Sequence, residues 1–245
     1  LLFVNLMAGD FNEGLIAQEK GDFKTALKIF TPLAIQGHKE AQYHLGFMYY
    51  KGTGINQNRR KAYDWFKKSA NQGFDKAQYR LGVMYYNGSD VKKDHKKAFY
   101  WYMKASEQGY SYAQYYLGSM YHLSQDYTNA FKWHNEAAKQ DHYKSQFILG
   151  TYYAKGLGIP KNEKLAFESF QKSAKQGHMK AQYRLGLMYE KGIARPKDLQ
   201  KAFQWYTKSS KQGYLYAQFR LGTLYYLSKD YKNALNLFEK AALQG

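Results

Sequence analysis

The sequence AQYHLGFMYYKG at residues 41–52 returns as AQYRLGLMYEKG at residues 181–192, with nine of the twelve residues identical. The Leu-Gly pair inside this stretch marks a period. Its glycine recurs as Gly46, Gly82, Gly118, Gly150, Gly186 and Gly222, at spacings of 36, 36, 32, 36 and 36 residues. Such regular spacing is typical of solenoid proteins, in which each unit buries its apolar face only by stacking on its neighbours.

Two further rows of residues follow the same period. One is an alanine row, made of Ala26, Ala62, Ala98, Ala130, Ala166, Ala202 and Ala234. The other is a Gln-Gly pair with glycines at Gly37, Gly73, Gly109, Gly177, Gly213 and Gly245, and Asp141 replaces one of these glycines. The rows predict one domain at residues 9–245 with seven units, at about 9–37, 38–73, 74–109, 110–141, 142–177, 178–213 and 214–245, the first being an incomplete match around Gly14.

Apolar residues within a unit have the spacing of α-helices. Ala41, Leu45 and Met48 lie on one helical stripe, and Ala62, Phe66 and Ala70 lie on another. Glycine-containing segments such as KGTGINQN (residues 51–58) separate the stripes, whereas the connections at HLSQDYTN (122–129) and YLSKDYKN (226–233) lack four loop residues. The sequence therefore predicts an all-α protein of about fourteen helices, two per unit, without a sheet.

Composition limits the classes of function. The 245-residue chain has a formal net charge of +18, from 37 Lys and Arg against 19 Asp and Glu. This charge favours nucleic acid, an anionic membrane surface or an acidic protein as partner. The chain has no cysteine, which excludes disulfides and thiol chemistry. It also has no run of 18 apolar residues that could span a membrane.

The first eight residues, 1–8, are apolar except for Asn5. Two interpretations remain open. The segment is the remnant of a signal peptide, which favours an exported or periplasmic protein, or it packs on the first unit, which leaves the cytoplasm open.

The repeated pattern carries a resemblance. Residues 41–73 read Ala-x-x-x-Leu-Gly-x-x-Tyr, then Gly-x-Gly-Ile, then Lys-Ala-x-x-Trp-Phe-x-x-Ser-Ala-x-x-Gly, which resembles the SEL-one-like repeat family, a relative of tetratricopeptide repeats. The resemblance extends from about residue 9 to the end. It implies a right-handed α/α superhelix that acts as a protein-interaction scaffold or adaptor, such as an immunity protein in bacteria, without shared catalytic residues.

The candidate binding site lies on the first helix of each unit, on the side opposite the Ala/Leu stripe. We call this side the candidate face, and in tetratricopeptide-like solenoids it is concave. It carries aromatic residues flanked by lysines, which suit an acidic protein or peptide. The candidate residues are Tyr43, Phe47, Tyr50, Lys76, Tyr79, Tyr86, Tyr112, Tyr115, Lys144, Lys180, Tyr183, Tyr216, Phe219 and Tyr226.

Other interpretations of these features stay open. Part of the aromatic row can pack between adjacent helices instead of facing a partner. An RNA-binding helical repeat is the alternative function, because helical repeats read bases with side chains and the chain is basic. A β-lactam enzyme is a remote third, since Ser89–Lys92 and Ser169–Lys172 match Ser-x-x-Lys but neither Ser-Asp-Asn nor Lys-Thr-Gly is present.

We expect no catalytic residue, cofactor or metal. His38, His142 and His178 occupy one position in three units, after the Gln-Gly turn, and are expected to be turn residues. The glycine loops are expected to cap helices, because no phosphate-binding Gly-x-x-x-x-Gly-Lys-[Ser/Thr] motif occurs. The last unit should leave an exposed apolar flank, through which self-association is possible.

Overall fold

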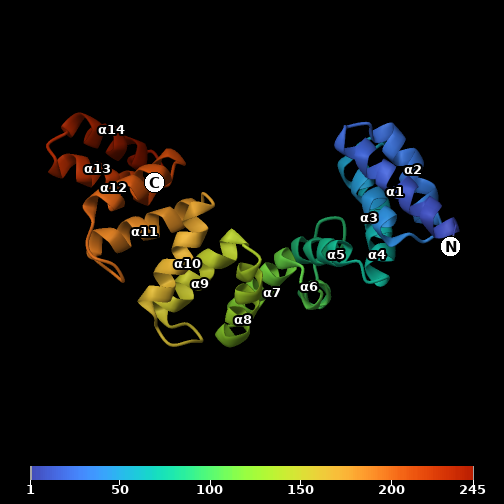
Figure 1. Cartoon of the computed structure of the whole chain (residues 1–245), viewed down its shortest axis with the longest axis horizontal. Helices are drawn as coiled ribbons and strands as arrows, with labels where there is room; N and C mark the ends of the chain where they lie inside the picture. The colour runs from blue at the N-terminus through green and yellow to red at the C-terminus, as the bar shows by residue number, and fades with distance from the viewer. Residues whose placement is uncertain (1, 245) are drawn as a thin grey trace. The chain divides into compact units, whose positions relative to one another are not determined.

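The computed structural model describes the backbone of residues 2–244 and the side chains of residues 11–244. Within them it contains fourteen α-helices and no strand, which confirms the predicted all-α solenoid of helix pairs (Figure 1). The first helices of the pairs are α1 (Leu2–Glu19), α3 (Lys39–Lys51), α5 (Asp75–Asn87), α7 (Ser111–Leu123), α9 (Tyr143–Lys155), α11 (Met179–Lys191) and α13 (Leu215–Leu227). The second helices are α2 (Phe23–Ile35), α4 (Arg59–Asn71), α6 (His95–Glu107), α8 (Tyr127–Lys139), α10 (Glu163–Lys175), α12 (Leu199–Lys211) and α14 (Tyr231–Ala242).

Contacts divide the chain into two compact units, Leu1–Leu117 and Gly118–Gly245, which we call the N-terminal and C-terminal units. The backbone of residues 2–8 belongs to α1, but the side chains of residues 1–8, on which both interpretations of that segment rest, lie outside the described part. The closing Gly245 also lies outside it.

In every pair, an aspartate or asparagine immediately before the second helix caps that helix. The cap side chain accepts the backbone N–H of the residue three positions later, as Asp126 does from Asn129 at 3.0 Å. This bond satisfies one of the amide groups that a helix leaves without a partner at its start. The capping residues are Asp22, Asn58, Asp94, Asp126, Asn162, Asp198 and Asp230.

The glycine of each Leu-Gly pair lies directly against a ring on the second helix of the same pair. A Cβ built on Gly82 would lie 2.5 Å from Cδ1 of Tyr102, and Gly14 and Gly46 lie in the same way against Phe30 and Phe66. A side chain at this position would have to displace the aromatic ring. Glycine therefore recurs once in every pair because the contact between the two helices requires it. Gly14 also shows that the incomplete first unit folds as a helix pair like the others.

A buried glutamine on the first helices joins consecutive pairs. Gln182 donates through its side-chain amide to the carbonyl of Ala174 on α10, at 3.2 Å. Its oxygen accepts from Gln212 in the turn after α12, at 2.9 Å. Gln42, Gln78 and Gln146 make the same two kinds of bond. The Gln-Gly turns recur because their glutamine satisfies this buried amide.

The departure at Asp141 is accommodated by its backbone. Asp141 takes the left-handed conformation, with φ of 58°, that Gly177 and Gly213 take in the corresponding turns. Aspartate adopts this region more readily than most residues do. Its carboxylate also accepts a hydrogen bond from the Gln146 side chain at 3.2 Å.

The connection between the helices of a pair is short in α1–α2, α7–α8 and α13–α14, and long in the other four pairs. The pattern therefore repeats every three pairs, and equivalent residues are 104 positions apart, as with the caps Asp22, Asp126 and Asp230. Residues of the N-terminal unit can therefore be compared directly with the residues 104 positions later in the C-terminal unit.

Candidate functional site

Three tyrosines of the candidate face lie half-buried in the seams between helices, namely Tyr43, Tyr79 and Tyr183, and Tyr115 is half-buried as well. Tyr183 shows how the seam is built, with ring centroids 5.9 Å from Tyr206 on α12 and 5.4 Å from Tyr214 before α13. Tyr79 has the equivalent neighbours, and its burial raises the pKa of its hydroxyl well above the usual value. The rings of Tyr43, Tyr79 and Tyr183 therefore pack between adjacent helices, as the alternative interpretation of the aromatic row anticipated for part of it.

Other candidate residues are open to solvent. Tyr112 is 52% exposed and Tyr216 is 57% exposed, and each lies on the solvent side of a seam tyrosine, 6.2 Å from Tyr79 and 6.1 Å from Tyr183 respectively. The remaining exposed candidates are Lys76, Lys144, Lys180, Phe219 and Tyr226, whereas Phe47, Tyr50 and Tyr86 are half-buried.

The expected apolar flank is present at the last pair. Phe219 packs against Phe238 with ring centroids 5.6 Å apart, and more than half of the Phe219 side chain stays exposed. Leu215, Tyr216 and Ala241 complete the hollow around these rings.

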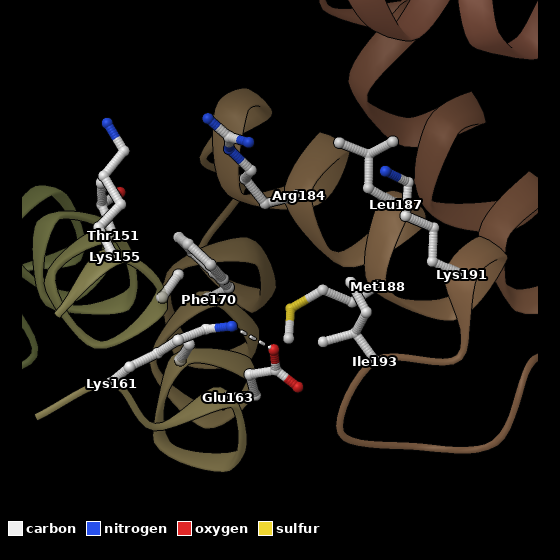
Figure 2. Close-up of a pocket in the computed structure, with 12 residues that line it drawn as sticks. Thr151, Lys155, Lys161, Glu163, Phe170, Arg184, Leu187, Met188, Lys191 and Ile193 are labelled. Carbon is white, nitrogen blue, oxygen red and sulfur yellow. Dashed lines mark ion pairs between the residues drawn. The ribbon is translucent and has the colours of Figure 1, made fainter.

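A pocket of 330 Å³ opens on the candidate face of the C-terminal unit (Figure 2). Its lining comes from α9, α10 and α11 and from the loops before α10 and after α11. The apolar part consists of Ala154, Ala166, Phe170, Leu187, Met188 and Ile193. Thr151, Lys155, Lys161, Glu163, Arg184 and Lys191 supply the polar rim, on which Lys161 and Glu163 form an ion pair at 2.8 Å.

Sequence reasoning missed this pocket, although the signal for it was in the row. Among the residues five positions after each leucine, Ala154 is the only small one, next to Tyr50, Tyr86 and Tyr226. A gap in a row of large side chains on one helical face predicts a hollow there.

The histidines play structural parts. His38, His142 and His178 are the residues immediately before α3, α9 and α11, so they are turn residues as expected, and His142 accepts the backbone N–H of Ser145. His134 is fully buried on α8, and this burial lowers its pKa from 6.5 to about 3. Within the described side chains, no group of three or more His, Asp or Glu residues is arranged to hold a metal ion.

The glycine loops cap helices, as predicted. Gly52 and Gly156 adopt left-handed conformations directly after α3 and α9, and their backbone N–H groups donate to the carbonyls of Met48 and Tyr152. In the part of the chain that the structure describes, no helix is both long enough and apolar enough to cross a membrane.

Comparisons with known proteins agree with this architecture. The model of the Sel1 repeat matches residues 39–74, 75–110, 111–142, 144–178, 180–214 and 215–245. The α1–α2 pair precedes the matched residues. The search of curated proteins gave no match.

Three solved structures show the range of similarity. The protein c5321, a protective antigen of uropathogenic Escherichia coli with an SLR fold, is 33% identical with a TM-score of 0.89, over 97% of this chain and 54% of that one. This chain therefore spans about half the length of the E. coli protein. A Sel1 repeat protein from Oxalobacter formigenes is 28% identical with a TM-score of 0.84, over 95% and 96% of the two chains. The immunity protein Pa5087 from Pseudomonas aeruginosa is 20% identical with a TM-score of 0.47, over 84% and 81%, which is too distant to bear on function.

Proposed function

Because this chain belongs to the Sel1 repeat family, whose repeats generally form scaffolds for protein–protein interaction, we propose that it is a non-catalytic scaffold. It binds an acidic partner polypeptide on the candidate face. The exposed tyrosines and lysines of that face make the contact, and the half-buried tyrosines hold them in place.

The observation that carries this proposal is the paired arrangement of Tyr112 over Tyr79 and of Tyr216 over Tyr183. In each pair the inner ring is fixed between helices, so the outer ring has a rigid support. A supported, exposed tyrosine offers a large contact area and loses little side-chain entropy on binding. The two pairs are 104 residues apart, so the same contact is available once in each unit.

Charge on the same face supports an acidic partner. Lys76, Lys144 and Lys180 are exposed there. Exposed lysines of this kind speed the approach of an acidic partner more than they tighten the final complex. A partner's acidic residues would therefore lie beside its contact with the tyrosines.

The experiment compares capture of proteins from the native extract by variants of the intact chain, with quantitative mass spectrometry. Tyr112→Ser together with Tyr216→Ser should reduce recovery of the specific partner about tenfold or more, since aromatic anchors at interfaces are each worth about 2 kcal/mol. Tyr100→Ser is the matched control, because Tyr100 is also 52% exposed but lies on the second helix α6.

Charge variants separate the face from general basicity. Lys144→Glu with Lys180→Glu should slow partner association, whereas Lys104→Glu with Lys208→Glu, on second helices, should have little effect. Equal loss from both pairs of lysines, or undiminished capture by the double tyrosine variant, would refute the proposed face. A single defined RNA bound tightly at physiological salt would instead favour the nucleic-acid alternative.

A further inference from the structure

We propose that the pocket beside Thr151, Ala154 and Arg184 receives an aromatic side chain of a partner polypeptide, and that acidic residues flank this side chain in the partner. The inference rests on the proposed function, because it assumes that the partner is a polypeptide. It adds a second site on the same face and states the chemistry that this site takes.

In the N-terminal unit, aromatic side chains occupy the position that is equivalent to this pocket. The residues 104 positions before Thr151, Ala154 and Arg184 are Phe47, Tyr50 and Arg80. The Phe47 and Tyr50 rings lie with centroids 6.5 Å apart, and the Arg80 guanidinium lies 5.2 Å from the Phe47 centroid. The chain therefore places two of its own aromatic rings where the C-terminal unit has a threonine and an alanine.

The walls of the two places are alike. Phe170, Met188 and Ala166 of the pocket correspond to Phe66, Met84 and Ala62 of the N-terminal unit. The open pocket thus keeps a surface against which aromatic side chains pack elsewhere in the same molecule. Its 330 Å³ is ample for one ring, since a cavity of about 150 Å³ is enough to hold benzene.

Arg184 in the C-terminal unit lacks the aromatic partner that the equivalent Arg80 has. Arg80 is half-buried under Phe47, whereas Arg184 is exposed, and within the described residues it makes no salt bridge or cation–π contact. An arginine over an aromatic face is stabilised by the charge distribution of the ring. A ring from the partner would restore the contact that Arg80 makes with Phe47.

The rim of the pocket carries a net positive charge, as its filled counterpart does. Lys161 and Lys191 stand where the N-terminal unit has the neutral Gln57 and Asn87, and Glu163 stands where it has Arg59, so the net charge of the two rims is equal. With Lys155 and Arg184 the two lysines give four positive groups against the single carboxylate of Glu163, which is already paired with Lys161 (Figure 2). This surplus charge favours carboxylates on either side of the bound ring.

The test uses the intact chain and three acetylated, amidated pentapeptides: Asp-Glu-Phe-Glu-Asp, Asp-Glu-Ala-Glu-Asp and Lys-Lys-Phe-Lys-Lys. Binding is followed by NMR titration through the backbone amides around the pocket. The acidic phenylalanine peptide should bind about tenfold more tightly than the alanine peptide, because it alone buries a ring. The basic peptide should not bind, and added salt should weaken the acidic one.

Two variants exchange the units' residues at this place. Thr151→Phe with Ala154→Tyr fills the pocket as the N-terminal unit does, and it should abolish the preference for phenylalanine while the melting temperature stays at or above that of the wild type. Phe47→Thr with Tyr50→Ala opens the N-terminal counterpart and should add a second binding site for the peptide.

A second set of variants tests the charge at the rim. Arg184→Ser with Lys191→Ser should reduce the affinity for the acidic phenylalanine peptide severalfold. The matched control is Lys172→Ser with Lys208→Ser, on second helices of the same unit.

Three results would overturn the inference: equal binding of the phenylalanine and alanine peptides, unchanged binding by the filled variant, or tighter binding of an oligouridylate than of the acidic peptide. These results are independent of the capture experiment with Tyr112 and Tyr216. The pocket can therefore fail while the proposed face holds. If the double tyrosine variant captures its partner normally but the filled variant does not, the proposed tyrosine contact fails and the pocket stands.

Discussion

Replacement of His134 by phenylalanine should remove a measurable part of this protein's sensitivity to acid. His134 lies on α8 against Gly118, at the position where the other second helices have Phe30, Phe66 or Tyr102. Phenylalanine is thus a residue type that this position accepts in other pairs of the same chain.

The magnitude follows from the difference between the folded and unfolded pKa of this side chain. Its pKa is about 3 in the folded chain, chiefly because burial disfavours the charged ring and secondarily because His122 and His142 are near, against 6.5 when unfolded. As the pH falls below 6.5, the unfolded chain takes up a proton that the folded chain does not, so stability falls with it. At pH 5 this difference lowers the free energy of unfolding by about 2 kcal/mol relative to pH 7.5.

The assay is urea denaturation followed by circular dichroism, at pH 7.5 and pH 5, for the wild type and His134→Phe. Between these pH values the variant should lose about 2 kcal/mol less stability than the wild type does. Burial also lowers the pKa of His44, His142 and His178 to about 4, so most of the acid sensitivity should remain in the variant.

The control is His95→Phe, because His95 is exposed on α6. This variant should keep the pH dependence of the wild type. If His134→Phe loses as much stability between pH 7.5 and pH 5 as the wild type does, then His134 is not a neutral buried side chain and the reasoning is wrong.

Three further substitutions test the contacts that define the repeat, each by urea denaturation at neutral pH. Gly82→Ala should cost about 1–3 kcal/mol, since its Cβ would press on the Tyr102 ring, and a neutral result would mean that the helices separate easily. Gln182→Leu should cost about 1–2 kcal/mol because the side-chain hydrogen bonds to the Ala174 carbonyl and from Gln212 are both lost, although the Gly177 backbone N–H still donates to that carbonyl; wild-type stability would show that these bonds contribute little. Asp126→Ala should cost about 1 kcal/mol through loss of the α8 cap, whereas Asp126→Asn should be nearly neutral; equal effects would argue against capping.

The helix pairs could be read from the sequence because their determinants are local and repeated. The glycine of each Leu-Gly pair, the alanine row and the Gln-Gly turns set the number and boundaries of the helices, and all of them act within one pair or between consecutive pairs. The exchange of glycine for Asp141 in one turn leaves the helix boundaries unchanged, because aspartate adopts the same left-handed conformation.

Which aromatic residues face solvent was decided only by the tertiary structure. Tyr79 and Tyr112 are the same residue type on the same helical face, yet Tyr79 is enclosed by Tyr102 and Tyr110 whereas Tyr112 is more than half exposed. The enclosing residues lie 23 and 31 positions further along the chain. The periodicity of one helix therefore shows which side a residue occupies but not what the neighbouring helices place over it.

The pocket depends on the same physical distinction. In sequence, Ala154 is one ordinary substitution in a row of larger side chains, and Thr151 stands where the N-terminal unit has Phe47. They form a cavity because the surrounding walls, from α10 and α11, are held in place by their own helix contacts and do not close over the missing rings. Sequence alone determined the repeated helices, since local spacing fixes them, whereas the shape and exposure of the binding surface arose only when side chains from several helices were packed together.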